Sequence, residues 1–292
     1  MADILLSEAE KTFILHGVRD NVRNDGRSCS EFRPIELELG LVENANGSAR
    51  VRLANTDVLV AVKCEIDNPS SNFPDEGKLD FFVDCSANAT PQFEGKGGEQ
   101  LAVELAALMS RAYQTRESFN LSTLSIIKGM KCWKLCIDVL ILECGGSLID
   151  AISMGTKAAL ADTKIPKVSV IGSDEGSLEL ELADEADGRE EPLDWHHAPC
   201  LVTLNKLEDS LLVDASAEEE ACCAAALIVG VSPNKKITTT SIPGHGSFLA
   251  DSKVFTRALN LAVDVGVKLN TALEAAIKKH QTLKPPPRGF LD

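Results

Sequence analysis

The segment from Leu135 to Ala161 constrains the fold of this chain more than any other segment does. Leu135 to Leu142 is almost continuously apolar apart from Asp138, which is typical of a β-strand covered on both faces. Cys144-Gly145-Gly146-Ser147 then breaks the chain, and the Ala-rich stretch from Leu148 to Ala161 predicts a helix. A strand covered on both faces needs layers on each side, so we expect an α/β or α+β fold with this helix packed against the sheet.

Hydrophobic periodicity predicts the other elements. Alternating apolar residues indicate strands, and a 3.6-residue period indicates helices. The expected strands are 35–39, 49–53, 58–66, 79–85 and 168–171, followed by 200–207, 211–215 and 227–231. The expected helices are 99–114, 148–161 and 251–279, with a further one near the N-terminus. The mixture predicts a mixed sheet in two parts.

The N-terminal helix has a recognisable start. Ser7 and Glu10 have the spacing of a capping box, in which each side chain accepts a hydrogen bond from the other residue's backbone N–H. We expect Ala9, Phe13, Ile14 and Gly17 to lie on one face of this helix.

The composition restricts the class of protein. The 292 residues are 44% apolar and carry a formal net charge of −15. No apolar run approaches the roughly 20 residues of a membrane span, and the acidic start, Met1 to Lys11, is unlike a secretory signal. We therefore expect an intracellular globular protein with no membrane partner. The net charge argues against nucleic-acid binding over the whole surface, but it is compatible with a local basic groove.

The 9 cysteines predict free thiols rather than disulfides, because their number is odd and their positions are scattered. Cys132 and Cys136 are close in sequence, and so are Cys222 and Cys223, but neither pair has a matching pair at zinc spacing. We expect no metal site and no cofactor.

An acidic stretch divides the chain. Residues 172–194 are rich in acids and poor in large apolar side chains, as in a solvated loop or a linker. We place the first domain at 1–190, the second at 191–280, and a flexible tail at 281–292. Pro285-Pro286-Pro287 in the tail cannot continue a helix.

Five groups of short motifs, which together span roughly residues 5 to 275, resemble one known family in their order. The motifs are Asn24-Asp25-Gly26-Arg27 with Phe32-Arg33-Pro34-Ile35, Asn46 to Val51 with Asn55 to Val62, Ala89 to Gly95, Leu142 to Ala151, and Val213 to Glu220. The family is that of RNase PH-type proteins, and the chain resembles within it the non-catalytic ring subunits of the eukaryotic RNA exosome.

The resemblance implies an RNase PH-like two-domain fold, with an N-terminal part like domain 2 of ribosomal protein S5 and a C-terminal RNase PH domain. It also implies a hetero-hexameric ring of RNase PH-like subunits, cap subunits of S1/KH type, and RNA passing through a central channel. The expected task is 3′–5′ RNA processing and degradation, including rRNA processing, in the nucleus, nucleolus and cytoplasm.

The resemblance also implies where a phosphorolytic site would lie. Active members hold phosphate with a Gly-Ser-Arg-Thr-like segment, and here that segment is Ser147-Leu148-Ile149-Asp150, with Ile149 at the arginine position and Asp150 expected to repel phosphate. The carboxylate pair of active members falls near Glu191 and His197. We therefore predict no catalytic residues and a subunit that is not an enzyme.

The remaining candidates have ordinary structural alternatives. Glu191 lies in an acidic run typical of a solvated face, and the adjacent His196 and His197 would point to opposite faces without a third metal ligand. Asp214 matches an acidic position of the family, and we expect it to cap the turn that follows.

Arg111 and Lys96 are the candidate RNA-binding residues. Arg111 matches a family position that faces RNA, although the second basic position of that pattern is Ala107 here. Lys96 lies in the glycine-rich loop 93–98 and could contact phosphates, or it could simply belong to an exposed flexible loop.

Two other functions stay open. The chain could be an active phosphate-dependent 3′–5′ exoribonuclease, if an arginine from elsewhere replaced the missing one. It could also be a small-molecule enzyme on a related α/β scaffold, although it has neither G-x-G-x-x-G nor a P-loop.

Overall fold

A computed structural model describes residues 5–115, 118–172, 178–182, 190–243 and 252–282. The helices are α1 (Glu8–Arg19), α2 (Glu99–Tyr113), α3 (Leu148–Asp162), α4 (Ala217–Cys222) and α5 (Ser252–Thr282). The larger sheet contains β1 (Ile35–Leu39), β2 (Gly47–Leu53), β3 (Thr56–Asp67), β4 (Lys78–Cys85), β5 (Ser125–Ile127) and β6 (Lys131–Glu143). The second sheet contains β11 (Cys200–Leu207), β12 (Ser210–Val213), β13 (Ala225–Val231) and β14 (Ile237–Ser241). Two short pairs, β7 (Lys164–Pro166) with β10 (Glu190–Pro192) and β8 (Val168–Gly172) with β9 (Leu178–Leu182), complete the strands.

The strand order confirms the predicted mixed α/β class. The larger sheet runs β1-β2-β3-β6-β4, with β5 paired to β6, and the second sheet runs β12-β11-β13-β14. Only β4 and β6 pair in parallel among these described strands. The predicted tail 281–292 lies outside the described residues from position 283 onward.

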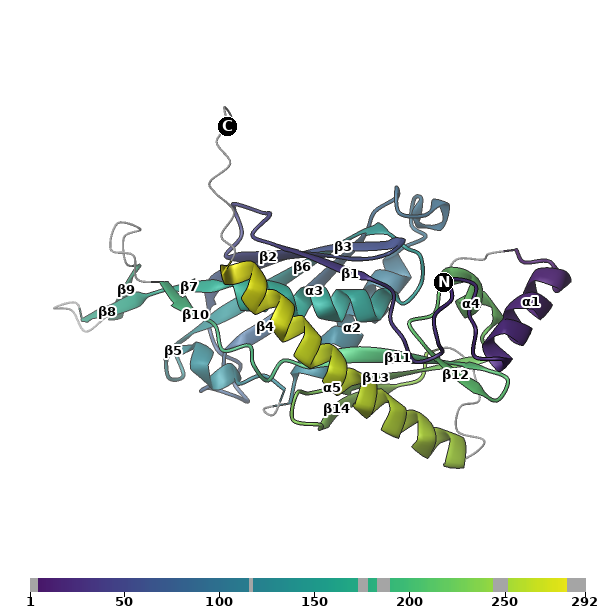
Figure 1. Cartoon of the computed structure of the whole chain (residues 1–292). Helices are drawn as coiled ribbons and strands as arrows, with labels where there is room; N and C mark the ends of the chain where they lie inside the picture. Colours follow the sequence, from purple (N-terminus) through teal and green to yellow (C-terminus); the bar gives the residue numbers. More distant parts are fainter. Residues whose placement is uncertain (1–4, 116–117, 173–177, 183–189, 244–251, 283–292) are drawn as a thin grey trace.

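Helix α3 lies between the two sheets (Figure 1). It packs on β2 and β3 of the larger sheet and on β11 of the second sheet, and every residue from Ile149 to Ala161 is buried. The approach is so close that a Cβ atom on Gly155 would lie 2.8 Å from a methyl carbon of Val60. The Ala-rich composition of α3 therefore follows from small side chains letting a helix fit between two sheets.

Lys157 extends from α3 to the C-terminal helix. Its side chain is fully buried, and its Nζ lies 2.6 Å from Asn270 Oδ1 and 3.3 Å from Glu274 Oε1, both on α5. The same ammonium lies 5.7 Å from the centre of the Trp195 ring. A buried ammonium requires such partners, so this network fixes how α5 lies against α3.

The N-terminal helix confirms one prediction and corrects another. Ser7 and Glu10 form the capping box on α1. Ile14 and Val18 form its buried face, while the Phe13 side chain is 67% exposed, so the predicted grouping of Phe13 with Ile14 is wrong. This buried face packs in one cluster with Leu207 and Leu212 of the second sheet and with Cys222 of α4.

Helix α5 is the longest described helix, with 31 residues. It packs across β11 and β13 and also touches β1 and α3, so its apolar residues face the protein on one side only. Among the described helices none is both long and apolar enough to cross a membrane.

Asp150 ties α3 to the second sheet. Its carboxylate accepts hydrogen bonds from Thr203 N at 3.0 Å, Thr203 Oγ1 at 2.6 Å and Ser147 Oγ at 3.1 Å. Burial raises the pKa of Asp150 to about 7, although the bonds from Thr203 oppose that rise. Asp150 therefore points to β11, and its carboxylate is a structural acceptor.

This pKa predicts a pH-dependent stability. A carboxyl that holds its proton more tightly when folded stabilises the chain below its ordinary pKa of 3.8, and that contribution is lost as the pH rises to about 7. We expect the difference in unfolding free energy between the wild type and Asp150→Asn to fall by on the order of 4 kcal/mol between about pH 4 and 7. Urea unfolding of both proteins at several pH values measures this difference in free energy.

The exposed Asp138→Asn is the matched control for replacing a carboxyl group with an amide. A pH-independent difference for Asp150→Asn would show that Asp150 ionises normally in the folded protein.

Candidate functional site

The turn at residues 144–147, which we call the Gly-Gly turn, joins β6 to the N-terminus of α3. Gly146 has a φ of +96°, and a Cβ atom there would lie 2.4 Å from the carbonyl oxygen of Ala215. Ser147, the N-cap residue, has a φ of 54° and makes no side-chain cap. Gly145 O accepts a hydrogen bond from Ala217 N at 3.1 Å. The second domain thus lies directly against the turn. Only glycine, which has no Cβ atom, permits so close an approach.

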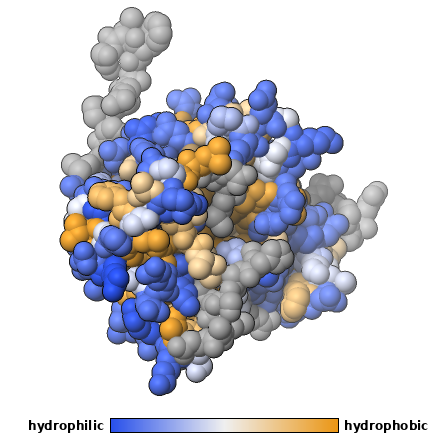
Figure 2. All heavy atoms as spheres, turned by 90° about the vertical axis from the view of Figure 1, so that its right-hand side faces the viewer, coloured by the Kyte–Doolittle hydropathy of each residue, from blue (hydrophilic) through white to orange (hydrophobic). Residues whose placement is uncertain are grey.

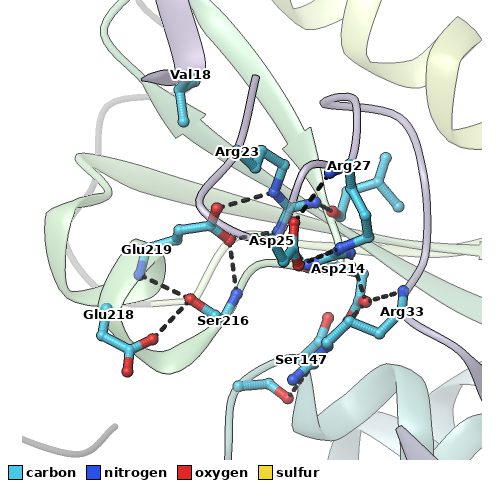
Figure 3. Close-up of polar contacts among 12 residues, drawn as sticks. Val18, Arg23, Asp25, Arg27, Arg33, Ser147, Asp214, Ser216, Glu218 and Glu219 are labelled. Atoms are coloured by element: carbon cyan, nitrogen blue, oxygen red, sulfur yellow. Dashed lines mark hydrogen bonds and ion pairs between the residues drawn. The ribbon is translucent and has the colours of Figure 1, made fainter. Parts of the chain in front are cut away.

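Three arginines from the N-terminal segment converge on the same region (Figure 3). Arg33 donates to both oxygens of Asp214, from Nη2 at 2.7 Å and Nε at 2.9 Å, and to the carbonyl oxygens of Gly145 and Gly146 at 3.0 Å. Arg27 donates to Asp214 Oδ2 at 3.0 Å. The Arg33 backbone N–H is a further donor to Asp214, at 2.7 Å.

Arg23 completes this arginine cluster, which we define as Arg23, Arg27 and Arg33 with Asp25, Asp214 and Glu219. Arg23 pairs with Glu219 through Nε and Nη2 and donates to the carbonyl oxygens of Val213 and Asp214. Burial lowers the pKa of Arg23, but hydrogen bonding and charge attraction from Glu219 outweigh burial and raise it. Three positive and three negative side chains balance, so the cluster can be buried without a net charge.

The cluster corrects the predicted role of Asp214. Asp214 does not cap the following turn: Ser216 is the N-cap of α4 and forms a capping box with Glu219. Asp214 instead has a φ of 48°, which ends β12 at Val213 rather than at the predicted Ala215, and it turns its carboxylate toward Arg27 and Arg33.

A cavity of about 140 Å³, the α3 cavity, lies at the N-terminus of α3. Leu148 and Ile149 line it, so the positions where an arginine was sought are apolar, and Asp150 is not among the lining residues. The geometry therefore does not support the prediction that Asp150 repels phosphate. Glu220 lines the cavity and its Oε1 accepts a hydrogen bond from Ser147 N at 2.8 Å.

The structure does not bring Glu191 or His197 to the Gly-Gly turn. Glu191 lies on β10, which pairs with β7 just after the C-terminus of α3, and it forms an exposed ion pair with Lys167 at 3.2 Å. His197 lies 3.4 Å from Asn234 in the turn between β13 and β14. The carboxylates that contact the turn are those of Glu220 and Asp150, both through Ser147, and Asp214 is linked to it through Arg33.

The described part of the chain offers no support for metal binding or for catalysis by a cysteine thiol. Within those ranges no group of three or more His, Cys, Asp or Glu side chains could hold a metal ion. His196 packs on the Trp195 ring with centroids 4.7 Å apart. All nine cysteines are free, and burial raises the pKa of Cys64 to about 12 and of Cys200 to about 11. Such thiols are poor nucleophiles.

Lys96 lies in the turn just before α2, and Arg111 lies in the last turn of that helix. Both side chains are exposed, and Arg111 Nε makes a long bond of 3.4 Å to Ala107 O. Within the described ranges neither forms an ion pair. The loop before α2 is closely packed, since a Cβ on Gly98 would lie 2.6 Å from Cys85 Cβ. The end of this loop is therefore held against β4, and the Lys96 side chain is exposed on it.

A wide cleft of about 940 Å³ separates α1 from the arginine cluster. Its α1 side is apolar, with Leu6, Ala9 and Phe13, and its other side includes Arg27 and Arg33. Figure 2, which views the molecule from this end, shows apolar patches among a mainly hydrophilic surface.

Comparisons with known proteins agree with this geometry. Residues 31–166 match the model of "3' exoribonuclease family, domain 1", and residues 197–265 match that of domain 2 of the same family. The two matches lie on either side of the acidic stretch.

Two curated proteins and one solved structure are similar over nearly the whole chain. A "Putative exosome complex exonuclease RRP42" of Dictyostelium discoideum is 30% identical over 94% of this chain and 98% of that protein. An "Exosome complex component Rrp42" of Thermococcus kodakarensis is 32% identical over 94% and 97%. A chain of the Archaeoglobus fulgidus exosome with RNA bound to the active site is 29% identical over 91% and 98%, with a TM-score of 0.78.

The arginine cluster predicts a strong dependence of stability on Arg33. Removing it in Arg33→Ala leaves the fully buried Asp214 with fewer donors and leaves the carbonyl groups of Gly145 and Gly146 without that partner. We expect a loss of about 3 to 5 kcal/mol in the free energy of unfolding, measured by urea denaturation. Arg33→Lys should recover little, because an ammonium cannot form the two-pronged contact.

Lys164→Ala is the control, since Lys164 and Glu190 form an exposed pair that should contribute under about 1 kcal/mol. Equal losses for Arg33→Ala and Lys164→Ala would contradict a structural role for the cluster.

Proposed function

We propose that this chain, which belongs to the 3′ exoribonuclease family of RNase PH type, is a non-catalytic structural subunit of an RNA exosome ring. The subunit would support 3′–5′ RNA processing and degradation by binding neighbouring subunits and positioning RNA, with no turnover of its own.

The side chains at the Gly-Gly turn and at the start of α3 are the main support for this proposal. Phosphorolysis needs a cation to hold the attacking phosphate and carboxylates free to bind a metal ion or protonate the leaving group. At the start of α3 the chain presents Leu148 and Ile149. Arg27 and Arg33 engage Asp214, and Ser147 N–H donates to Glu220. Neither a cation for the attacking phosphate nor a carboxylate for the metal ion or the leaving group is therefore free at this turn.

The alternative is an active phosphate-dependent 3′–5′ exoribonuclease. The printed name of the Dictyostelium relative contains the word exonuclease. In this chain Arg33 is the cation nearest to the turn, and Asp214 engages its Nε and Nη2. An active site would therefore require the arginine cluster to come apart.

We extend the proposal to the partners. They would be other RNase PH-like subunits in a hetero-hexameric ring, cap subunits of S1/KH type, and RNA in the central channel. Solved archaeal exosome cores resemble this chain. The chain also exposes large apolar side chains on α1 and on the segments either side of it, with Leu5, Phe13 and Val22 at 98%, 67% and 59% exposure. Apolar surface of this kind is typical of protein contacts.

Lys96 and Arg111 are the RNA contacts in this proposal. Two exposed cations at the two ends of one helix can bind phosphates several nucleotides apart, and the net charge of −15 makes such local cations the available means of RNA binding. We also propose residence in the nucleus, nucleolus and cytoplasm, which the family resemblance implies. We keep the domain division at residues 190 and 280 because of the acidic stretch and the proline-rich tail.

The first test is activity and assembly together. The purified chain, given a single-stranded RNA with phosphate and Mg²⁺, is expected to release no nucleoside diphosphate. Co-expressed with RNase PH-like partners, it is expected to co-elute in a ring-sized particle on size-exclusion chromatography.

Phosphate-dependent release of nucleoside diphosphates that disappears in Glu220→Gln would establish the exoribonuclease instead. A chain that stays monomeric in the presence of every ring partner would contradict the structural role.

The second test is RNA affinity of the assembled ring. Lys96→Glu and Arg111→Glu are each expected to weaken binding several-fold, because each replaces a phosphate-binding cation with an anion. Neutral variants, Lys96→Gln and Arg111→Gln, should lower the slope of log affinity against log salt by about 0.7 each.

Lys279→Glu, an exposed cation in the last turn of α5, is the control and should leave affinity nearly unchanged. Equal effects of all three reversals would indicate a general charge effect rather than contacts along α2.

A further inference from the structure

Helix α1 has apolar side chains on two sides, and the rest of the described chain covers only one of them. Ile14 and Val18 are buried against the second sheet and α4. Phe13 is 67% exposed, and it lines the wide cleft together with Ala9, one helical turn before it. A surface helix of a globular protein usually carries one apolar face, which packs on the core. The described residues thus leave a second apolar side of α1 open at the cleft.

The wall of the cleft opposite α1 offers no free cation among its described residues. Arg27 and Arg33 line the cleft, but Asp214 accepts hydrogen bonds from both of them, and Asp25 accepts one from Arg27 (Figure 3). A phosphate group that entered the cleft would have to compete with these carboxylates for the two guanidinium groups.

The accessible charge of the cleft is negative. Four carboxylates line it, and two of them, Glu10 on α1 and Glu218 on α4, are exposed and form no ion pair within the described ranges. Ser7 donates hydrogen bonds to Glu10, which lower the pKa of that carboxyl, and the Ser216 hydroxyl donates to Glu218. Such a surface repels the phosphates of RNA and of lipid head groups, and it attracts lysine and arginine side chains.

Helix α1 is an addition to the two domains that match the family. The matched ranges begin at residues 31 and 197, whereas α1 ends at Arg19. Figure 1 shows α1 at one end of the molecule, beside α4. A contact made through α1 therefore adds to any contact that the two matched domains make with other subunits.

We propose that the wide cleft binds a basic amphipathic helix of a partner protein that is not a ring subunit. The apolar side of that helix packs on Phe13 and Ala9, and its lysines or arginines pair with Glu10 and Glu218 on the two walls. A helix lying in an apolar groove is a common form of protein recognition. The volume of about 940 Å³ lies at the upper end of the range for pockets that enclose a bound molecule.

This inference goes beyond the proposed function, because it assigns a protein that a ring recruits rather than a subunit that forms it. Two other occupants lead to different results. A neighbouring ring subunit would fill the cleft in the assembled ring, so an added helix would bind the isolated chain but not the ring. A second copy of this chain would cover Phe13 in a dimer, so the purified chain would self-associate through α1.

The experiment measures fluorescence anisotropy with a labelled peptide of about four helical turns, made of leucine and lysine with the leucines on one helical face. The purified chain and the assembled ring are both expected to bind it, with similar affinity. The same peptide with glutamate in place of lysine is the control probe and should bind neither. Added salt should weaken binding of the basic peptide, because it screens the charge attraction.

Substitutions locate the binding. Phe13→Glu is expected to weaken it by about tenfold or more, because the apolar anchor is lost. Phe73→Glu is the matched control, since Phe73 is 55% exposed in the loop between β3 and β4 and does not line the cleft. Glu218→Lys should weaken binding about threefold, whereas Glu43→Lys, at an exposed site between β1 and β2, should leave it unchanged.

Phe13→Ala takes the place of Phe13→Glu if the latter does not fold. The proposal is overturned if the basic peptide binds neither the chain nor the ring, or binds the Phe13 variant as tightly as the wild type. Binding to the chain that is lost in the ring, or a purified chain that dimerises until Phe13 is replaced, would overturn it as well. Peptide binding is measured on the purified chain whether or not a ring forms or RNA is degraded, so this inference and the proposed function can fail separately.

Discussion

The complete burial of α3 is the constraint on which the rest of the molecule depends. Neither sheet covers this helix alone, so the two sheets are related to each other through the faces that α3 presents to them. Small residues are needed where β2 and β3 approach, as Gly155 shows against Val60. Polar residues are needed where the second sheet and α5 must be oriented, as Asp150 and Lys157 show. The helix therefore sets both the packing distance and the register of the two domains.

The N-terminal segment joins the domains a second time, by charge rather than by packing. Arg33 contacts Asp214 in the second domain and the carbonyl groups of the Gly-Gly turn in the first. The family motifs that contain Asp25 to Arg27 and Phe32 to Pro34 thus serve structure in this chain, because Arg27 and Arg33 hold Asp214.

Local patterns predicted much of the fold. The capping box of α1, the strand β6 and the long α5 all appeared within a few residues of their observed ends. The prediction that β6 is covered on both faces is wrong, because Asp138 is exposed and Leu140 is only half-buried on its second face. Strands such as β5, β7 and β10 have only three residues and carry no period to detect. The capping box of Ser216 and Glu219 was visible in the sequence and would have indicated α4. The pairing of Asp214 with Arg33 was not visible, because no local pattern connects residues 181 positions apart.

That separation bears on how the chain acquires its structure during synthesis. At about 5 to 20 residues per second, roughly 10 to 40 s pass between the synthesis of Arg33 and that of its acceptor Asp214. Throughout that time Arg23 and Arg33 lack their carboxylate acceptors Glu219 and Asp214, whereas Arg27 can already pair with Asp25. The larger sheet, including β1 on β2, can form meanwhile, but the segment before β1 lacks its contacts with the second domain. Completion of the fold therefore waits on the ribosome reaching α4, and a chain that terminates before Asp214 leaves Arg33 without its carboxylate acceptor.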